Sequence, residues 1–284
     1  MASLFGAIDE ALTRGEAVAL VTIVRAQGST PQRVGARMLV HEDGRTLGTI
    51  GGGCYEQDAL GKARLALQTG RPTLAHYDLN DDFAEEQGLI CGGQMDVFID
   101  PITPTPRVCI IGAGHVGYHT AQLAANVGFR VTVVDDRASF ADPARFPTAE
   151  RVDVADIPEW LRTADIGARD YLVIVTRGHR EDLDALRAAL ARQTAYVGLI
   201  GSRAKVARLC ARLAEDGDDP TAMARVHAPI GLDLGAVSPE EIAVSIVAEL
   251  IAHRRGRLQP HTAADDAETA RAARPMQWRP PAIR

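Results

Sequence analysis

The sequence lacks the features that mark several large classes of protein. Its four cysteines are too few and too scattered for a disulfide framework or for a zinc site with paired ligands. No apolar stretch approaches the roughly 18–20 residues of a membrane span, and the first residues do not have the pattern of a leader peptide. We therefore expect a cytoplasmic protein with reduced thiols and no membrane contact.

Basic clusters are also missing ahead of the Arg-containing C-terminal segment. The chain has 31 Lys and Arg against 37 Asp and Glu, which gives a formal net charge of −6. A nucleic-acid groove needs clustered cations that displace phosphate counterions, so nucleic acid is not an expected partner. Hydrophobic residues at 46% and charged residues at 24% are ordinary for a globular protein, and 284 residues suffice for two cores.

The first 105 residues combine helical and extended patterns. Helices are expected at 4–16 and 54–68, and strands at 17–25, 36–41, 46–50, 73–78 and 94–100. The acidic segment 80–87 is a predicted loop, and the proline-containing segment 101–106 is a predicted linker. The sequence therefore predicts an α+β N-terminal domain over residues 1–105.

The second half alternates strands with helices. Strands are expected at 107–111, 130–135, 171–176 and 196–200, and helices at 115–126, 181–192, 203–215 and 238–253. The last helix begins with a capping box at Ser238 followed by Pro239. Such alternation predicts a Rossmann-like α/β domain with a mainly parallel sheet over residues 106–256, followed by a flexible tail at 257–284.

Three glycines between a predicted strand and a predicted helix have the spacing of a dinucleotide fingerprint. Gly112 permits a tight turn, Gly114 lets the backbone approach a pyrophosphate, and Gly117 lets helix and sheet pack closely. His115 lies inside this motif, and Asp135 ends the next strand, where a carboxylate can bind ribose hydroxyls. A nucleotide such as NAD(P), or another phosphate-bearing ligand, is the predicted occupant. The alternative is that the glycines only satisfy packing.

Further candidate ligand contacts follow other predicted strands at their carboxyl ends, where doubly wound sheets bind ligands. Arg177 and His179 follow one strand, and Ser202, Arg203 and Lys205 follow the next. Ser202 is also a predicted helix cap, which accounts for the serine but not for the two cations. We expect the cations near the rim of the glycine motif.

Two cysteines in the N-terminal half lie beside glycines. Cys54 follows Gly51, Gly52 and Gly53 at a predicted helix start, where free amides and the helix dipole lower a thiol pKa. Cys91 precedes Gly92 and Gly93 in a second loop of the same kind. Soft thiolates suit molybdenum, and glycine amides suit a phosphate, so Cys54 and Cys91 are candidate metal ligands. The alternative is that both are small buried residues, as Cys109 and Cys210 are expected to be.

The motifs as a set resemble the XdhC/CoxI family. The resemblance covers roughly residues 20–256 and is specific, because the dinucleotide fingerprint alone is common whereas this series of blocks is not. The matching blocks are GSTPQRVGARM (28–38), GTIGGGCYE (48–56), CGGQMDVFID (91–100), GAGHVG (112–117), VVDDR (133–137), VTRGHREDL (175–183), YVGLIGSRAK (196–205) and HAPIGLDLGAVSPEEIAVSI (227–246).

The resemblance implies an accessory protein rather than an enzyme. A member of this family is expected to bind molybdenum cofactor (molybdopterin), to protect it while a cysteine desulfurase sulfurates it, and to insert it into xanthine dehydrogenase or a related molybdenum hydroxylase, a step in purine catabolism. By position, Cys54, Glu56 and Cys91 would face the cofactor, and glycines 51–53 and 92–93 would cradle it. A homodimer is also compatible with the resemblance.

Two other functions fit parts of the sequence. An NAD(P)-dependent oxidoreductase would use the GAGHVG motif and Asp135, although the sequence offers no clear acid–base pair for hydride chemistry. A regulatory nucleotide-binding module would use the same motif without molybdenum.

Overall fold

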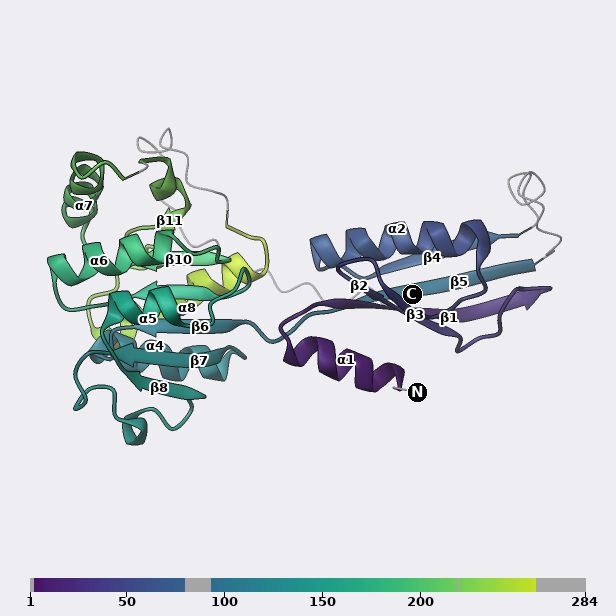
Figure 1. Cartoon of the computed structure of the whole chain (residues 1–284), viewed down its shortest axis with the longest axis horizontal. Helices are drawn as coiled ribbons and strands as arrows, with labels where there is room; N and C mark the ends of the chain where they lie inside the picture. Colours follow the sequence, from purple (N-terminus) through teal and green to yellow (C-terminus); the bar gives the residue numbers. More distant parts are fainter. Residues whose placement is uncertain (1–2, 80–92, 219, 259–284) are drawn as a thin grey trace. The chain divides into compact units, whose positions relative to one another are not determined.

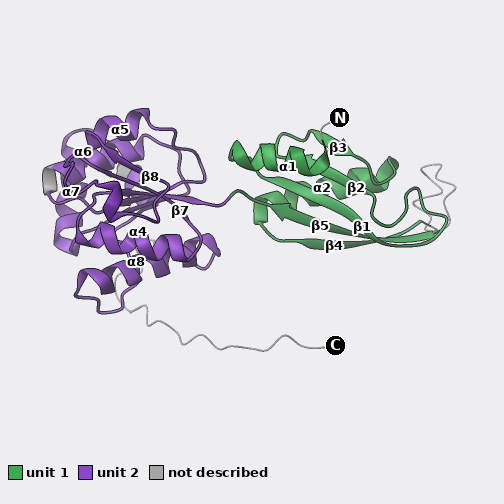
Figure 2. Ribbon diagram, turned by 90° about the horizontal axis from the view of Figure 1, so that it is seen from below, with its two compact units in different colours: residues 1–104 green, residues 105–284 purple. Residues whose placement is uncertain are grey.

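The computed structural model describes residues 3–79, 93–218 and 220–258, which fold as two compact units (Figures 1 and 2). Unit 1 comprises residues 1–104 and unit 2 residues 105–284, so the division falls within the proline-containing segment. The predicted loop at 80–87 and the predicted tail beyond residue 258 lie outside the described residues. Among the described helices, none has the length and apolar content needed to cross a membrane.

Unit 1 is a five-stranded antiparallel sheet in the order β3-β2-β1-β5-β4, with one helix on each face. In chain order its elements are α1 (Leu4–Thr13), β1 (Val18–Gly28), β2 (Arg37–His41), β3 (Thr46–Gly48), α2 (Gly53–Thr69), β4 (Thr73–Asp78) and β5 (Gly93–Ile102).

Alternation along the strands gives this sheet two apolar faces. Neighbouring residues of β1 point to opposite sides, so Val18 packs with α1 whereas Ala19 packs with α2. The α2 residues that meet the sheet include Ala59, Ala63 and Ala66, whose small side chains let the helix lie close to it. Figure 1 shows α1 and α2 on opposite sides of these strands.

The predicted linker at 101–106 is wrong at its start, because β5 continues through Ile102. Pro101 pairs with Ala19 and Ile102 with Val18. Proline is tolerated here because β4 begins opposite Ile99, so strand β4 does not flank β5 at Pro101.

Unit 2 is a six-stranded parallel sheet in the order β11-β10-β9-β6-β7-β8. Its elements are β6 (Arg107–Ile111), α4 (His115–Asn126), β7 (Arg130–Asp135), a 3₁₀ turn (Pro143–Arg145), β8 (Arg151–Val154), α5 (Ile157–Thr163), β9 (Tyr171–Ile174), α6 (His179–Leu190), β10 (Tyr196–Leu199), α7 (Arg203–Glu215), a second 3₁₀ turn (Pro220–Arg225), β11 (Val226–His227) and α8 (Pro239–Arg254).

Helices cover both faces of this sheet, which confirms the predicted Rossmann-like class. α5, α6 and α7 pack with one set of strand residues, including Cys109 and Ile111, whereas α4 and α8 pack with the alternate set, including Val108 and Ile110. The strand order reverses between β6 and β9, and this switch point is where doubly wound sheets open a ligand crevice.

Two strands and one α-helix of unit 2 were not predicted from the sequence, and neither were its two 3₁₀ turns. β8 has four residues, β11 has two and α5 has seven, so none has a long periodic pattern. The start of α5 did carry a local signal, because Asp156 caps it by accepting the Glu159 N–H at 3.0 Å and a proline follows in the first turn.

Candidate functional site

A carboxylate four residues along the chain holds the glycine turn that begins α2. Glu56 accepts hydrogen bonds from the Thr49 hydroxyl at 2.5 Å, the Ile50 N–H at 2.9 Å and the Gly52 N–H at 3.1 Å. Burial opposes the charge on Glu56, but these hydrogen bonds outweigh it and keep its pKa below the ordinary value. Glu56 therefore fixes the shape of the turn, and its carboxylate is engaged with the backbone.

The glycines of unit 1 are needed for different reasons. A Cβ on Gly51 would lie 2.5 Å from the Pro31 side chain, and one on Gly93 would lie 2.5 Å from the Gln27 carbonyl oxygen. Gly52 differs, because a Cβ there would meet nothing within 4 Å. Its φ of +76° nevertheless favours glycine, and it is the N-cap of α2 without a side-chain hydrogen bond. Gly52 is thus the glycine of this turn that faces open space.

The turn before α2 and the start of β5 lie at the same end of unit 1. The segment after β1 contacts both, because Pro31 lies against Gly51 and the Ser29 carbonyl oxygen lies against Gly93. In addition, the Tyr55 hydroxyl donates to the Asp78 carbonyl at 3.3 Å, where β4 ends. Gly51 to Gly53 and Gly93 therefore lie at one end of the unit.

The thiols have different surroundings. Cys54 is half-buried on the first turn of α2 and packs against the apolar core beneath that helix. Cys91 and Gly92 lie outside the described residues, so the predicted pairing of the two thiols stays a prediction. Cys109 is buried, as predicted, and burial raises its pKa to about 12, whereas Cys210 is only half-buried.

Within residues 3–79, 93–218 and 220–258, no group of three or more His, Cys, Asp or Glu could hold a metal ion.

Two glycines of the unit 2 fingerprint are required by packing, and the third is not. A Cβ on Gly112 would lie 2.6 Å from the Val175 carbonyl oxygen, and one on Gly117 would lie 2.0 Å from the Gly112 carbonyl oxygen. A Cβ on Gly114 would meet nothing within 4 Å, and its φ of −67° suits any residue. Gly114 is the N-cap of α4 without a side-chain hydrogen bond. Neither packing nor backbone conformation requires glycine at this position.

Asp135 ends β7, as predicted, but its carboxylate is fully engaged inside the protein. Oδ2 accepts the Ala113 N–H at 2.7 Å and Arg137 Nη2 at 2.8 Å, while Oδ1 accepts the backbone N–H of Arg137 at 3.0 Å and its Nε at 2.8 Å. Burial opposes ionisation, yet these hydrogen bonds outweigh it and lower the pKa of Asp135 to about 2. A ribose hydroxyl would have to displace Arg137, so Asp135 positions the glycine loop instead.

A cavity of about 440 Å³ opens at the switch point of the sheet. Gly114 and His115 line it from the start of α4, and Thr176 and Arg177 line it after β9. Its other lining residues are Val116, Arg137, Phe140, Val175, Ile200 and Pro239. The cavity therefore combines an uncapped helix start, two guanidinium groups and apolar walls, which suits an anionic ligand with a planar apolar part.

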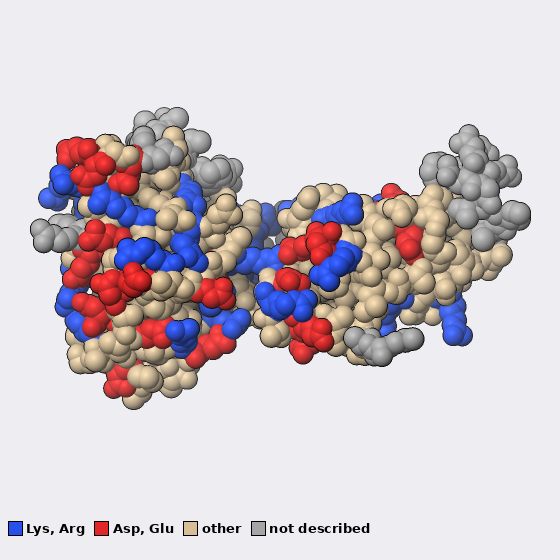
Figure 3. Space-filling model, viewed as in Figure 1, with Lys and Arg blue, Asp and Glu red and all other residues tan. Residues whose placement is uncertain are grey.

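Arginine side chains set the charge at this cavity. The Arg137 guanidinium lies 3.6 Å from the centroid of the Phe140 ring. Arg177 is half-exposed and pairs with Asp136 at 3.1 Å and Glu181 at 3.0 Å. On the visible face of each unit, positive and negative side chains are interspersed (Figure 3). The positive charge at this cavity is therefore local, and both guanidinium groups that carry it are themselves paired with carboxylates.

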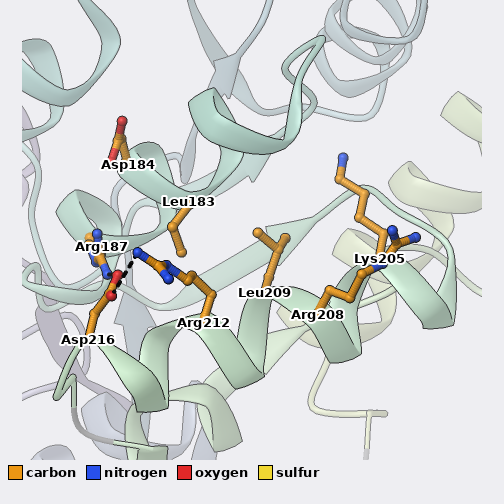
Figure 4. Close-up of a pocket in the computed structure, with 8 residues that line it drawn as sticks. All are labelled: Leu183, Asp184, Arg187, Lys205, Arg208, Leu209, Arg212 and Asp216. Carbon is orange, nitrogen blue, oxygen red and sulfur yellow. Dashed lines mark hydrogen bonds and ion pairs between the residues drawn. The ribbon is translucent and has the colours of Figure 1, made fainter.

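The other predicted ligand contacts of unit 2 do not all lie at the crevice. Ser202 caps α7 by accepting the Lys205 N–H at 3.2 Å, as predicted, and Arg203 is exposed on the first turn. Lys205 lines a second cavity of about 550 Å³ between α6 and α7 (Figure 4). Its ammonium group pairs with the buried carboxylate of Asp182. His179 begins α6 directly after the Gly178 N-cap.

Sequence reasoning missed several residues at the crevice. Arg137 and Phe140 follow β7, and Thr176 follows β9. Arg137 belongs to the VVDDR block, so a signal was present, although Asp135, two residues earlier, was the predicted contact. Asp182 belongs to the VTRGHREDL block, but its burial on α6 depends on tertiary packing, which the sequence does not show.

Two protein-family models match the chain, one within each unit. A family model described as the XdhC Rossmann domain matches residues 108–250. A second model, the XdhC and CoxI family, matches residues 11–78. The chain belongs to the XdhC and CoxI family.

Curated relatives of this family member align over most of the chain. "Uncharacterized protein YqeB" of Escherichia coli strain K12 is 38% identical over 82% of this chain, which spans 43% of that longer protein. A protein of Bacillus subtilis strain 168 that is named as a probable xanthine dehydrogenase subunit is 26% identical over 87% of this chain and 96% of its own length. "Molybdenum cofactor insertion chaperone PaoD" of Escherichia coli strain K12 is 24% identical over 86% of each chain.

Proposed function

We propose that this XdhC/CoxI family member is a molybdenum cofactor chaperone that hands the cofactor to xanthine dehydrogenase or a related molybdenum hydroxylase. The observation that carries the proposal is the crevice at the switch point of unit 2. There an uncapped helix start at Gly114 borders a cavity of about 440 Å³, and neither packing nor conformation requires glycine. The similarity to a relative that is named as a molybdenum cofactor insertion chaperone supports the choice of cargo.

The residues at the crevice suit the pterin part of such a cargo. Backbone amides of the first turn of α4 would bind its phosphate, because helix starts favour anions. The guanidinium groups of Arg137 and Arg177 add positive charge beside them. The Phe140 ring and the Val175 side chain offer apolar surface to a ring system. In this proposal Gly114, His115 and Arg177 contact the cargo, and Asp135 and Gly117 shape the loop.

Unit 1 offers a second, separate candidate site for the same cofactor, one that contains thiols. Cys54 lies at the end of unit 1 where the open Gly52 and the start of β5 also lie. We propose that Cys54 and Cys91 bind the molybdenum and that glycines 51–53 and 92–93 cradle the cofactor while a cysteine desulfurase supplies sulfur. Glu56 acts by holding the turn. The role is binding and transfer in the cytoplasm rather than catalytic turnover, and a homodimer is compatible with it.

An NAD(P)-dependent oxidoreductase has less support. The carboxylate that would bind the ribose hydroxyls, Asp135, already accepts hydrogen bonds at both oxygens from Ala113 and Arg137. Spectroscopic titration of the purified protein with NADH and NADPH checks this point. Saturable binding of either compound together with substrate-dependent oxidation would favour the oxidoreductase.

Transfer to a client tests the proposal. The protein is isolated without oxygen from cells that make molybdenum cofactor and is mixed with a cofactor-free molybdenum hydroxylase. We expect hydroxylase activity to rise with the amount of added protein, whereas protein from cells unable to make the cofactor has no effect. Equal activation by both preparations, or by neither, would contradict a chaperone role.

A further inference from the structure

A buried carboxylate in unit 2 connects the crevice to α7. Asp182 lies on the first turn of α6 with no exposed surface. One of its oxygens accepts a hydrogen bond from the Thr176 hydroxyl, and the other pairs with the Lys205 ammonium group. A buried carboxylate needs such partners, because an unpaired one is costly in free energy. Asp182 therefore has a fixed position between Thr176 and Lys205.

This arrangement decides how Thr176 can interact with a ligand. A threonine hydroxyl has one proton to donate and two lone pairs that can accept. The proton of Thr176 is committed to Asp182, and Thr176 is among the residues that line the crevice. Toward the crevice, the Thr176 oxygen can therefore only accept a hydrogen bond.

The Lys205 side chain is held in place along its length. A Cβ on Gly201 would lie 2.8 Å from the Lys205 Cδ atom, so the glycine leaves room for the lysine stem. The Lys205 side chain is 15% exposed and starts from the first turn of α7, which Ser202 caps. In Figure 4 its nitrogen points away from the Arg212–Asp216 pair that lines the same cavity. Lys205 thus serves as the counter-charge of Asp182.

We propose that Thr176 is a specificity-determining residue that accepts a hydrogen bond from an N–H or O–H group of the cargo, and that Asp182, paired with Lys205, is the positioning residue that makes it an acceptor. The crevice then selects a ligand with phosphate at the α4 end and a hydrogen-bond donor at the β9 end. A reduced pterin that carries phosphate has both features, because its ring amines are donors. This inference rests on the proposed function, since it assigns the cargo to this crevice.

The test compares two probes on the full-length protein by calorimetric titration. Dihydroneopterin triphosphate offers phosphates and pterin donors, whereas inorganic triphosphate offers phosphates alone. We expect Thr176→Val to weaken binding of the pterin compound about tenfold, the effect of one lost hydrogen bond, and to leave inorganic triphosphate unchanged. Thr176→Ser should bind both probes as the parent protein does, because it keeps the hydroxyl.

Tyr196→Phe is the matched control for stability. Its hydroxyl also donates to a buried carboxylate, Glu249, at 2.8 Å, but Tyr196 is the first residue of β10, at the opposite end of the strands from the crevice. We expect this variant to bind both probes normally. Equal weakening of both probes by Thr176→Val, an unchanged affinity for the pterin compound, or a parent protein that binds neither probe would overturn the inference. The amount of molybdenum bound to the isolated protein is a separate test of the chaperone role.

Discussion

The glycine turn of unit 1 is held by a carboxylate four residues away, whereas the glycine loop of unit 2 is held by one 22 residues away. Both turns lead into a helix whose N-cap is a glycine without a side-chain hydrogen bond, Gly52 in one unit and Gly114 in the other. Both N-cap glycines face open space. The two units thus present the same kind of anion-binding helix start.

The difference lies in what the backbone requires. Gly52 has a φ of +76°, so the turn itself explains why glycine is present. Gly114 has a φ of −67° and no neighbour for a Cβ to meet, so the protein alone does not explain it. A ligand that approaches the backbone closely does explain it. The comparison therefore makes Gly114 the more informative position for function and Gly52 the more informative one for folding.

The largest loss of stability is expected at Gly117, the unit 2 glycine for which a Cβ would make the closest contact. In Gly117→Ala, the new Cβ would lie 2.0 Å from the Gly112 carbonyl oxygen, and backbone atoms cannot move aside without distorting the loop. We expect a loss of about 3 kcal/mol or more in the free energy of unfolding, measured by urea denaturation. A loss below about 0.5 kcal/mol would show that the loop repacks easily.

The next effect concerns the carboxylate that holds the unit 2 loop. Its pKa of about 2 lies below the unfolded value, so Asp135 stabilises the folded state above about pH 4, and this stabilisation is lost as the pH falls through 2. Asp135→Asn should lower the free energy of unfolding at pH 7 by about 2 kcal/mol. The variant and the parent should then converge in stability toward pH 2. Parallel pH profiles for the two proteins would contradict this role of Asp135.

A smaller effect is expected at the corresponding carboxylate of unit 1. Glu56→Gln replaces a charged carboxylate, whose Oε2 atom accepts all three hydrogen bonds, by a neutral amide oxygen that accepts more weakly. Because Glu56 is partly solvated, we expect a loss of about 1 kcal/mol in thermal or urea unfolding. Glu10→Gln, at an exposed position of α1, is the control and should have no effect. If both variants lose the same stability, Glu56 does not hold the turn.

The smallest effect on stability is expected at the open glycine of unit 2. Gly114→Ala should change the free energy of unfolding by no more than about 0.5 kcal/mol, because its φ suits alanine and its Cβ meets nothing. Gly52→Ala should cost about 1–3 kcal/mol, since its φ of 76° and ψ of −172° lie in a backbone region that is essentially confined to glycine. Equal losses in the two variants, measured under the same conditions, would remove the distinction between the two helix starts.

The sequence predicted elements well where a short apolar run is bounded by turn residues or where a helix has clear end signals. The bounds of β4, β6, α4, β7 and α7 agree with the predicted ranges, and the Ser238 capping box is present at the start of α8. β8 and α5 escaped prediction because four and seven residues are too few for a periodic pattern, although Asp156 and a first-turn proline mark the start of α5.

The sequence located the fingerprint glycines between β6 and α4 but not their separate roles. The glycine positions are correct, yet the sequence does not reveal that Gly112 and Gly117 serve packing whereas Gly114 is open. Asp135 was expected to bind a ligand and instead binds Arg137 and the Ala113 amide. Which partner satisfies a carboxylate depends on tertiary contacts, and residue spacing carries no such information.

Cofactor content of the Gly114→Ala protein tests the central claim most directly. Parent and variant are purified without oxygen from cells that make molybdenum cofactor, and bound molybdenum and pterin are measured per protein chain. If the open helix start of α4 contacts the cargo, the parent retains both in equal amounts and the variant loses most of them while its stability stays unchanged. A variant that retains as much molybdenum and pterin as the parent, or a parent that retains neither, would contradict the account.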